Sequence, residues 1–219
     1  MSTKELQNLK QRFLDMYSDK LKTVWRTRDT EWLEHYIRNS KDFNKITSTI
    51  NGHLDSIRVL QKHLSKSRDL SPKEFALFEV FTYLTLAEGA TCNALNYFSY
   101  LLVTMGHDLF IDRKKKREKI KDNIKKIRKV KMHTKIRFLN YNGFKALTKE
   151  YDSTLRNNIA HFNFRTDEKG IVWIEGEQVD LNSKIDSLIK IARFTKDVFD
   201  ELYKRAEDAF AKFKKEVKT

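Results

Sequence analysis

Apolar residues recur at three- and four-residue steps along the first third of the chain, a pattern that predicts amphipathic helices. One helix is expected over about residues 3–25, a shorter one after Thr30, and another over about residues 46–64. This part of the chain shows no pattern of catalytic residues, so we expect its helices to have a structural role.

Ser71, Pro72 and Glu74 form a strong helix start. Serine caps the helix, proline is tolerated in its first turn, and glutamate completes a capping box. The helix that they open is apolar nearly all round and is expected to end before Gly106. Its length would allow a membrane span, but polar and acidic residues in its middle favour a central core helix.

Further helical patterns cover residues 144–159 and, at the end of the chain, about residues 183–217. Between them, residues 162–165 and 171–175 alternate as short strands around a Gly-containing turn. The pattern therefore predicts an all-α fold of long helices with one short β-hairpin.

The composition supports this class, because 219 residues contain one proline, six glycines and 34% charged residues. We expect residues 1–70 to form a helical segment that packs on a domain of residues 71–219, in one continuous globular unit. The single Cys92 excludes a disulfide framework and a cysteine metal site, and the polar N-terminus does not resemble a signal peptide. A cytoplasmic protein without stable membrane insertion is expected.

The formal net charge of +14 is concentrated in one stretch, residues 113–137, hereafter the basic segment. It holds fourteen Lys or Arg against two acidic residues, a local charge of +12, which leaves +2 for the other 194 residues. Ile120, Ile124, Ile127 and Val130 still make an apolar stripe, which predicts a folded amphipathic helix.

The basic segment has three interpretations: a solvated face, a helix on an anionic membrane, or a phosphate-binding surface. Its strong charge asymmetry favours nucleic acid, bound mainly through phosphates and therefore sensitive to salt. The predicted RNA-binding residues are those of its densest part: Arg113, Lys114, Lys115, Lys116 and Arg117.

Residues 156–161, Arg-Asn-Asn-Ile-Ala-His, are the stretch most suggestive of chemistry. Leu155, Ile159 and Phe162 are spaced to line one face of a helix. In an unbroken helix Arg156 and His161 would point roughly 140° apart. Either the helix ends inside the motif, or two copies of the motif meet across an interface.

This stretch resembles the signature of the HEPN superfamily, all-α domains with Arg, four to six residues and then His. Arg156, Asn157 and His161 fill the three signature places, and the hairpin and long final helix that follow fit the same resemblance. The resemblance covers about the last two-thirds of the chain. It implies a HEPN-like helical bundle.

The same three residues are sufficient for metal-independent cleavage of RNA. Histidine can exchange a proton with the ribose 2′-OH or the leaving 5′-oxygen, and arginine can hold the scissile phosphate. Asn157 would orient the His161 ring or the phosphate. Attack by the 2′-OH would leave a 2′,3′-cyclic phosphate and a 5′-OH, with no metal or other cofactor required. His35, His53 and His63 lack metal-binding spacing and are interpreted as ordinary surface histidines.

Glu88 lies in the apolar helix after Ser71 and should be paired. A structural salt bridge is the favoured interpretation. The alternative is that Glu88 holds Arg156 in place beside the site.

The HEPN resemblance also implies partners. Ribonucleases of this family are homodimers with a composite site, and many are toxins or antiviral effectors silenced by an antitoxin such as a minimal nucleotidyltransferase. Some toxin members carry a tyrosine, which the partner modifies, two residues after the histidine. The corresponding residue here is Asn163.

Two other interpretations of the motif remain. Residues 156–161 could form an ordinary helix C-terminus, with Asn and His capping the last turn. The chain could also be a catalytically inactive HEPN-type module for RNA binding or protein assembly, as some members are.

Overall fold

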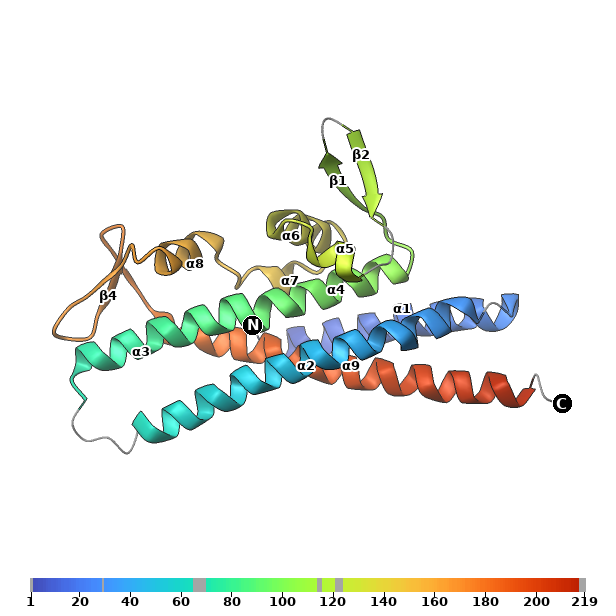
Figure 1. The fold of residues 1–219 in the computed structure, drawn as a ribbon, viewed down its shortest axis with the longest axis horizontal. Helices are drawn as coiled ribbons and strands as arrows, with labels where there is room; N and C mark the ends of the chain where they lie inside the picture. Colours follow the sequence, from blue (N-terminus) through green and yellow to red (C-terminus); the bar gives the residue numbers. More distant parts are fainter. Residues whose placement is uncertain (1, 29, 65–69, 114–115, 121–123, 217–219) are drawn as a thin grey trace. The chain divides into compact units, whose positions relative to one another are not determined.

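The structure, a computed structural model, describes residues 2–28, 30–64, 70–113, 116–120 and 124–216. Helices make up most of these residues, which confirms the predicted all-α class (Figure 1). The helices are α1 (Thr3–Thr27), α2 (Glu31–Leu64), α3 (Pro72–Thr85), a π-helical turn η1 (Leu86–Thr91), α4 (Cys92–Thr104), α5 (Ile124–Arg128), α6 (Met132–Tyr141), α7 (Lys145–Thr148), α8 (Ser153–Ala160) and α9 (Leu181–Glu216). The strands are β1 (Leu109–Arg113), β2 (Lys116–Ile120), β3 (Arg165–Thr166), β4 (Val172–Ile174) and β5 (Glu177–Val179).

The chain divides into two compact units. The first consists of Met1–Thr47, Leu95–Thr148 and Arg193–Thr219, and the second of Ser48–Ala94 and Lys149–Ala192. Helices α2, α4 and α9 each run through both units. The motif of residues 156–161 belongs to the second unit, and the basic segment to the first.

An aromatic cluster forms the core of the first unit. Phe13 of α1 is fully buried between Phe98 of α4 and Phe144, with ring centroids 4.9 and 4.4 Å away. The guanidinium of Arg12 lies over the Phe144 ring and donates to the carbonyl oxygens of Asn142 and Gly143. These contacts fix α1 against the turn after α6.

Helix α2 is continuous where two helices were predicted, so the expected break before residue 46 is wrong. The residues between the two predicted helices are part of α2. Ser40 is buried and its hydroxyl donates to the Tyr36 carbonyl at 2.8 Å, while Phe43 is fully buried against Tyr97 and Tyr100.

The helix predicted from Ser71 is found, with both halves of the capping box in place. It runs as α3, η1 and α4, and it ends before Gly106 as expected. The fully buried side chains of Leu95, Phe98 and Leu101 make α4 a core helix. Among the described residues, none of the helices combines the length and apolar character needed to cross a membrane.

The single amphipathic helix predicted for the basic segment is wrong. Its first part belongs to an antiparallel hairpin of β1 and β2, in which Asp112 is the register partner of Arg117 (Figure 1). A helix there would place like charges at three- and four-residue spacings, which is unfavourable. The predicted stripe survives only in part, since Ile124, Ile127 and Val130 are buried in and after α5.

The helix predicted over residues 144–159 is also interrupted, since α7 and α8 are separate. Thr148 ends α7, and its hydroxyl donates to the Asn140 side chain at 2.5 Å. Asp152 then starts α8 as its N-cap, because its Oδ1 accepts from the Leu155 backbone N–H at 2.9 Å.

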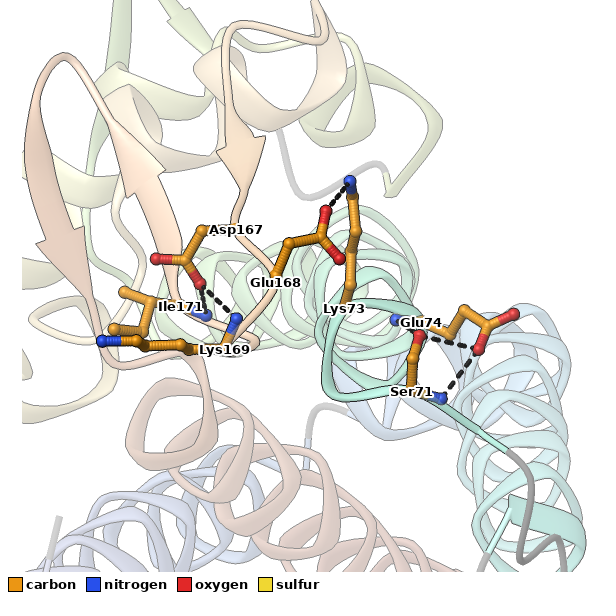
Figure 2. A network of polar contacts seen from close by, with 7 residues as sticks. All are labelled: Ser71, Lys73, Glu74, Asp167, Glu168, Lys169 and Ile171. Carbon is orange, nitrogen blue, oxygen red and sulfur yellow. Dashed lines mark hydrogen bonds and ion pairs between the residues drawn. The ribbon is translucent and has the colours of Figure 1, made fainter.

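The predicted hairpin after the motif is present and continues into a third strand, in the antiparallel order β3-β4-β5. Asp167 closes the first turn by accepting the backbone N–H groups of Lys169 and Ile171 (Figure 2). In the same view, Glu168 pairs with Lys73 at 2.7 Å. A side chain at Gly170, whose φ is +79°, would meet the Pro72 carbonyl oxygen at 2.7 Å. The turn therefore rests directly on the start of α3.

Candidate functional site

Helix α8 is held in the second unit by its apolar face. Leu155 and Ile159 are 6% and 2% exposed, one helical turn apart. The Tyr83 hydroxyl of α3 donates to the carbonyl of Asp152, the N-cap of α8, at 3.4 Å. These contacts leave Arg156 and Asn157 on the parts of the helix that reach solvent.

Arg156 forms an ion pair with Glu88, which is part of the π-helical turn η1. Its Nη1 also donates to the Asn157 side-chain oxygen at 2.5 Å. The hydrogen bond to Glu88 raises the pKa of Arg156, so the guanidinium remains cationic. Both partners reach solvent, with side-chain exposures of 30% for Arg156 and 40% for Glu88. The prediction that Glu88 is paired is therefore confirmed. Its side chain is more exposed than its place in an apolar helix suggested.

Arg156 has donor capacity beyond these two contacts. A guanidinium carries five N–H donors. Its Nη1 and Nη2 atoms each carry two N–H groups, and each atom makes one of these contacts. The second N–H of each is left for another acceptor, whereas the Nε is buried and is not accessible to one.

The helix ends inside the motif, as one of the two sequence alternatives requires. Ala160 is the last residue of α8, and His161 is its C-cap with φ −97° and ψ 11°. The His161 backbone N–H donates to the Asn157 carbonyl at 3.0 Å, and the residue is exposed. Because α8 ends at Ala160, the angle of roughly 140° expected between Arg156 and His161 in an unbroken helix does not apply.

Phe162 does not belong to the apolar stripe, so that part of the prediction is wrong. It lies beyond the helix in the left-handed region, with φ +59°, and is 73% exposed. Its N–H donates to Ile159 and that of Asn163 donates to Asn158, which is the hydrogen-bond pattern of a Schellman motif. The left-handed conformation was not predictable from the local residues, because glycine usually occupies this position.

Tyr151 and Cys92 lie next to the ion pair. The Cys92 thiol donates to the Tyr151 hydroxyl at 3.7 Å. Burial raises the pKa of Tyr151, while the charge of Arg156 acts in the opposite direction. Tyr151 is therefore a neutral phenol at physiological pH.

His53 is more than a surface histidine, because its ring packs against Gly89 of η1. A Cβ at Gly89 would lie 2.6 Å from His53 Cε1 and 2.8 Å from Nδ1. Gly89 follows Glu88 directly, so α2 supports the π-helical turn that carries the partner of Arg156. π-Helical turns occur frequently at functional sites.

This packing predicts that Gly89→Ala is less favourable than Gly52→Ala. Alanine normally favours a helix over glycine by about 0.5–1 kcal/mol, but at Gly89 its methyl group would meet the ring end of the His53 side chain, which must turn aside. Urea unfolding measures the difference. Gly52→Ala is the matched control, since a Cβ at Gly52 meets nothing within 4 Å. Equal effects of the two substitutions, or no relief of the Gly89→Ala effect by His53→Ala, would contradict the packing.

The predicted RNA-binding residues lie in the β1–β2 hairpin or outside the described residues. Arg113, Lys116 and Arg117 are in the two strands, whereas Lys114 and Lys115 fall outside what the structure describes. Within residues 124–137, the exposed cations are Lys125, Lys126, Arg128, Lys129, Lys131 and Arg137.

Lys135 is not part of this basic surface. It is 2% exposed, and its Nζ donates to the side-chain oxygen of Asn96 at 2.5 Å and to the Arg128 carbonyl at 3.4 Å. One of the fourteen cations counted in the sequence therefore serves the core of the first unit.

Across the described residues, the acidic, histidine and cysteine side chains form no group of three that could hold a metal ion.

Comparisons of the chain with protein-family models, with curated proteins and with solved structures found no match. The HEPN resemblance thus stays a prediction from the motif and its surroundings.

Proposed function

We propose that the protein is a HEPN-type, metal-independent endoribonuclease with Arg156, Asn157 and His161 as its catalytic residues. The observation that supports this most strongly is the Glu88–Arg156 ion pair, which holds the motif arginine in a partly exposed position. Asn157 bonds to the same guanidinium, and the helix ends where His161 begins. The exposed cations of the basic segment supply phosphate contacts.

In the proposed reaction the ribose 2′-OH attacks the adjacent phosphorus, and the bond from phosphorus to the 5′-oxygen breaks. A neutral imidazole removes the 2′-OH proton, and an imidazolium gives a proton to the leaving oxygen. Arg156 stabilises the charge that develops on the phosphate oxygens. The products are a 2′,3′-cyclic phosphate and a 5′-OH.

In a single chain, one histidine would have to act as both the base and the acid. This favours a homodimer with a composite site. Two chains related by a twofold axis would supply two copies of Arg156, Asn157 and His161 to one groove. Sedimentation equilibrium tests this part: a protein that remains monomeric at assay concentration would contradict the composite site.

In the cell, such an enzyme fits a toxin or antiviral defence role. Its proposed partners are RNA and an antitoxin, for example a minimal nucleotidyltransferase. Because residue 163 is asparagine, silencing by modification of a tyrosine at that position is not proposed.

The experiment that tests the proposal is incubation of a mixed RNA pool with the purified protein in EDTA, followed by analysis of the new ends. We expect internal cuts with 2′,3′-cyclic phosphate and 5′-OH ends. Absence of cleavage by folded, dimeric protein at high concentration would favour an inactive RNA-binding or assembly module. Binding to anionic liposomes in a flotation assay, without RNA binding, would instead indicate a membrane-surface protein.

The proposal predicts that Glu88→Gln lowers the cleavage rate by about tenfold or more, because Arg156 loses the charged partner that orients it. The effect on the free energy of unfolding should stay below about 1 kcal/mol, since the pair is partly exposed. Glu79→Gln is the matched control, because Glu79 of α3 accepts from Asn182 at 2.7 Å instead. Rates of cleavage and urea unfolding are measured for both variants. A cleavage rate unchanged by Glu88→Gln would show that Arg156 does not depend on Glu88.

A further inference from the structure

The π-helical turn η1 contains one residue more than a regular helix would have at this place. The turn joins α3 to the start of α4, and the Cys92 backbone N–H donates to the Ala87 carbonyl, five residues earlier. In an α-helix the acceptor is four residues earlier. One extra residue turns the side chains before it by roughly 100° relative to those directly after it.

This rotation brings side chains from both ends of the turn to one side. Tyr83 and Cys92 are nine residues apart, so an unbroken α-helix would point them roughly 180° apart. With one extra residue between them, the angle falls to roughly 80°. The Tyr83 hydroxyl donates to the Asp152 carbonyl at 3.4 Å. The Cys92 thiol donates to the hydroxyl of the preceding residue, Tyr151, at 3.7 Å. Both ends of the turn thus contact the two residues that precede α8.

The ion pair of the candidate site depends on the same turn. Glu88 lies within η1 and pairs with Arg156 of α8. A regular α-helix would point Tyr83 and Cys92 in opposite directions, so it could not keep both contacts to residues 151–152 with Glu88 still between them on Arg156. All of these residues belong to the second unit. The π-helical form of η1 is therefore what presents Glu88 to α8.

Asn93 stabilises the turn through a side-chain hydrogen bond. Its Nδ2 donates to the Gly89 carbonyl, four residues earlier, at 2.7 Å, and the residue is partly buried. Where backbone bonds return from a five-residue to a four-residue step, one carbonyl is left without a backbone donor, which is unfavourable away from water. A side-chain amide at this place compensates for the missing donor. Gly89, held in this way by Asn93 and packed against the His53 ring, directly follows Glu88.

We propose that Asn93 is a positioning residue of the ribonuclease, because its hydrogen bond to Gly89 keeps η1 in the π-helical form that holds Glu88 on Arg156. This inference rests on the proposed function and deepens it, since it adds a residue that acts on the phosphate-binding arginine through Glu88. Asn93 has no direct part in the chemistry.

The test compares Asn93→Ala with Asn93→Ser. A serine hydroxyl in a helix also donates to the carbonyl four residues earlier, so serine can replace the hydrogen bond, whereas alanine cannot. We expect Asn93→Ala to lower the single-turnover cleavage rate by about tenfold, as Glu88→Gln does, and Asn93→Ser to cleave close to the wild-type rate. Asn39→Ala is the matched control, because the Asn39 Nδ2 makes the same kind of bond, to the His35 carbonyl at 2.9 Å, within α2. It should leave the rate unchanged.

Two further measurements distinguish positioning from a merely structural role. In a Glu88→Gln background, Asn93→Ala should lower the rate by less than about twofold more, because both changes act on the same arginine. The guanidinium nitrogen NMR signals of Arg156, identified by their loss in Arg156→Lys, should shift in Glu88→Gln and in Asn93→Ala. They should stay in place in Asn93→Ser and in Asn39→Ala. Thermal unfolding checks the fold of each variant. If Asn93→Ala does not fold, Asn93→Asp takes its place, since aspartate keeps the shape but has no N–H to donate.

The inference is overturned if Asn93→Ser loses as much activity as Asn93→Ala, or if the losses from Asn93→Ala and Glu88→Gln multiply in the double variant. Cleavage by the wild type with Arg156 signals that do not respond to Asn93→Ala would also overturn it and would leave the ribonuclease activity in place. Shifted Arg156 signals without any cleavage by the wild type would instead remove the proposed activity and retain the coupling from Asn93 to Arg156.

Discussion

His161→Ala is expected to reduce RNA cleavage by about 10²- to 10⁴-fold, the range that positioned proton transfer contributes. The substitution should leave the fold intact, because the His161 side chain is exposed and the residue joins α8 through its backbone N–H. Single-turnover cleavage of a labelled oligoribonucleotide measures the rate, and thermal unfolding checks the fold.

The matched control for this prediction is His63→Ala, since His63 is also exposed and belongs to α2. It should cleave at the wild-type rate. Arg156→Lys adds a second test, because lysine keeps the positive charge but lacks the planar set of donors that holds a phosphate through two bonds. Full activity of His161→Ala, or equal losses in the two histidine variants, would exclude His161 from the chemistry.

Phe13→Ala is expected to lower the free energy of unfolding by about 3–5 kcal/mol. The ring is fully buried and stacks between Phe98 and Phe144, so its loss removes apolar burial and leaves a cavity in the first unit. Because domains are stable by only about 5–15 kcal/mol, this is a large fraction of the total. Urea unfolding followed by circular dichroism measures it.

Tyr141→Ala is the control for Phe13→Ala, since Tyr141 belongs to the same unit and is 92% exposed. It should change the free energy of unfolding by less than about 1 kcal/mol. If Phe13→Ala lowers the free energy of unfolding by no more than Tyr141→Ala does, the aromatic cluster does not stabilise this unit substantially.

The helices with strong local signals were predictable from the sequence. Ser71 and Glu74 form the capping box that opens α3, and the helix ends before Gly106 as the pattern indicated. The period of apolar residues also located α1 and α9. Local signals suffice in these places, because capping and helical periodicity act within a few residues.

Other features depend on residues far away in the chain and were not predictable. Two helices were predicted within residues 30–64, but they form the single helix α2, in which Phe43 packs on α4. Lys135 was counted as a surface cation, and only its contact with Asn96, 39 residues away, explains its burial. The hairpin of β1 and β2 was missed because the apolar residues from Ile120 to Val130 were interpreted as the stripe of one helix through the basic segment.

At the candidate site the sequence located the residues but not their geometry. It picked Arg156 and offered Glu88 as one partner, and the two are paired. The π-helical turn that carries Glu88 depends on packing between His53 and Gly89, which periodicity does not reveal. The left-handed Phe162 departs from the usual preference for glycine, and such departures concentrate at functional sites.

The central claim is that the RNA strand is cut by its own 2′-OH at a site built from Arg156, Asn157 and His161. The most direct measurement compares one oligoribonucleotide with an otherwise identical strand that carries a single 2′-deoxy residue at the cut position, both in EDTA. The claim predicts a 2′,3′-cyclic phosphate product from the first strand and no cut at that position in the second. Equal cleavage of both strands at that position, or of neither, would contradict it.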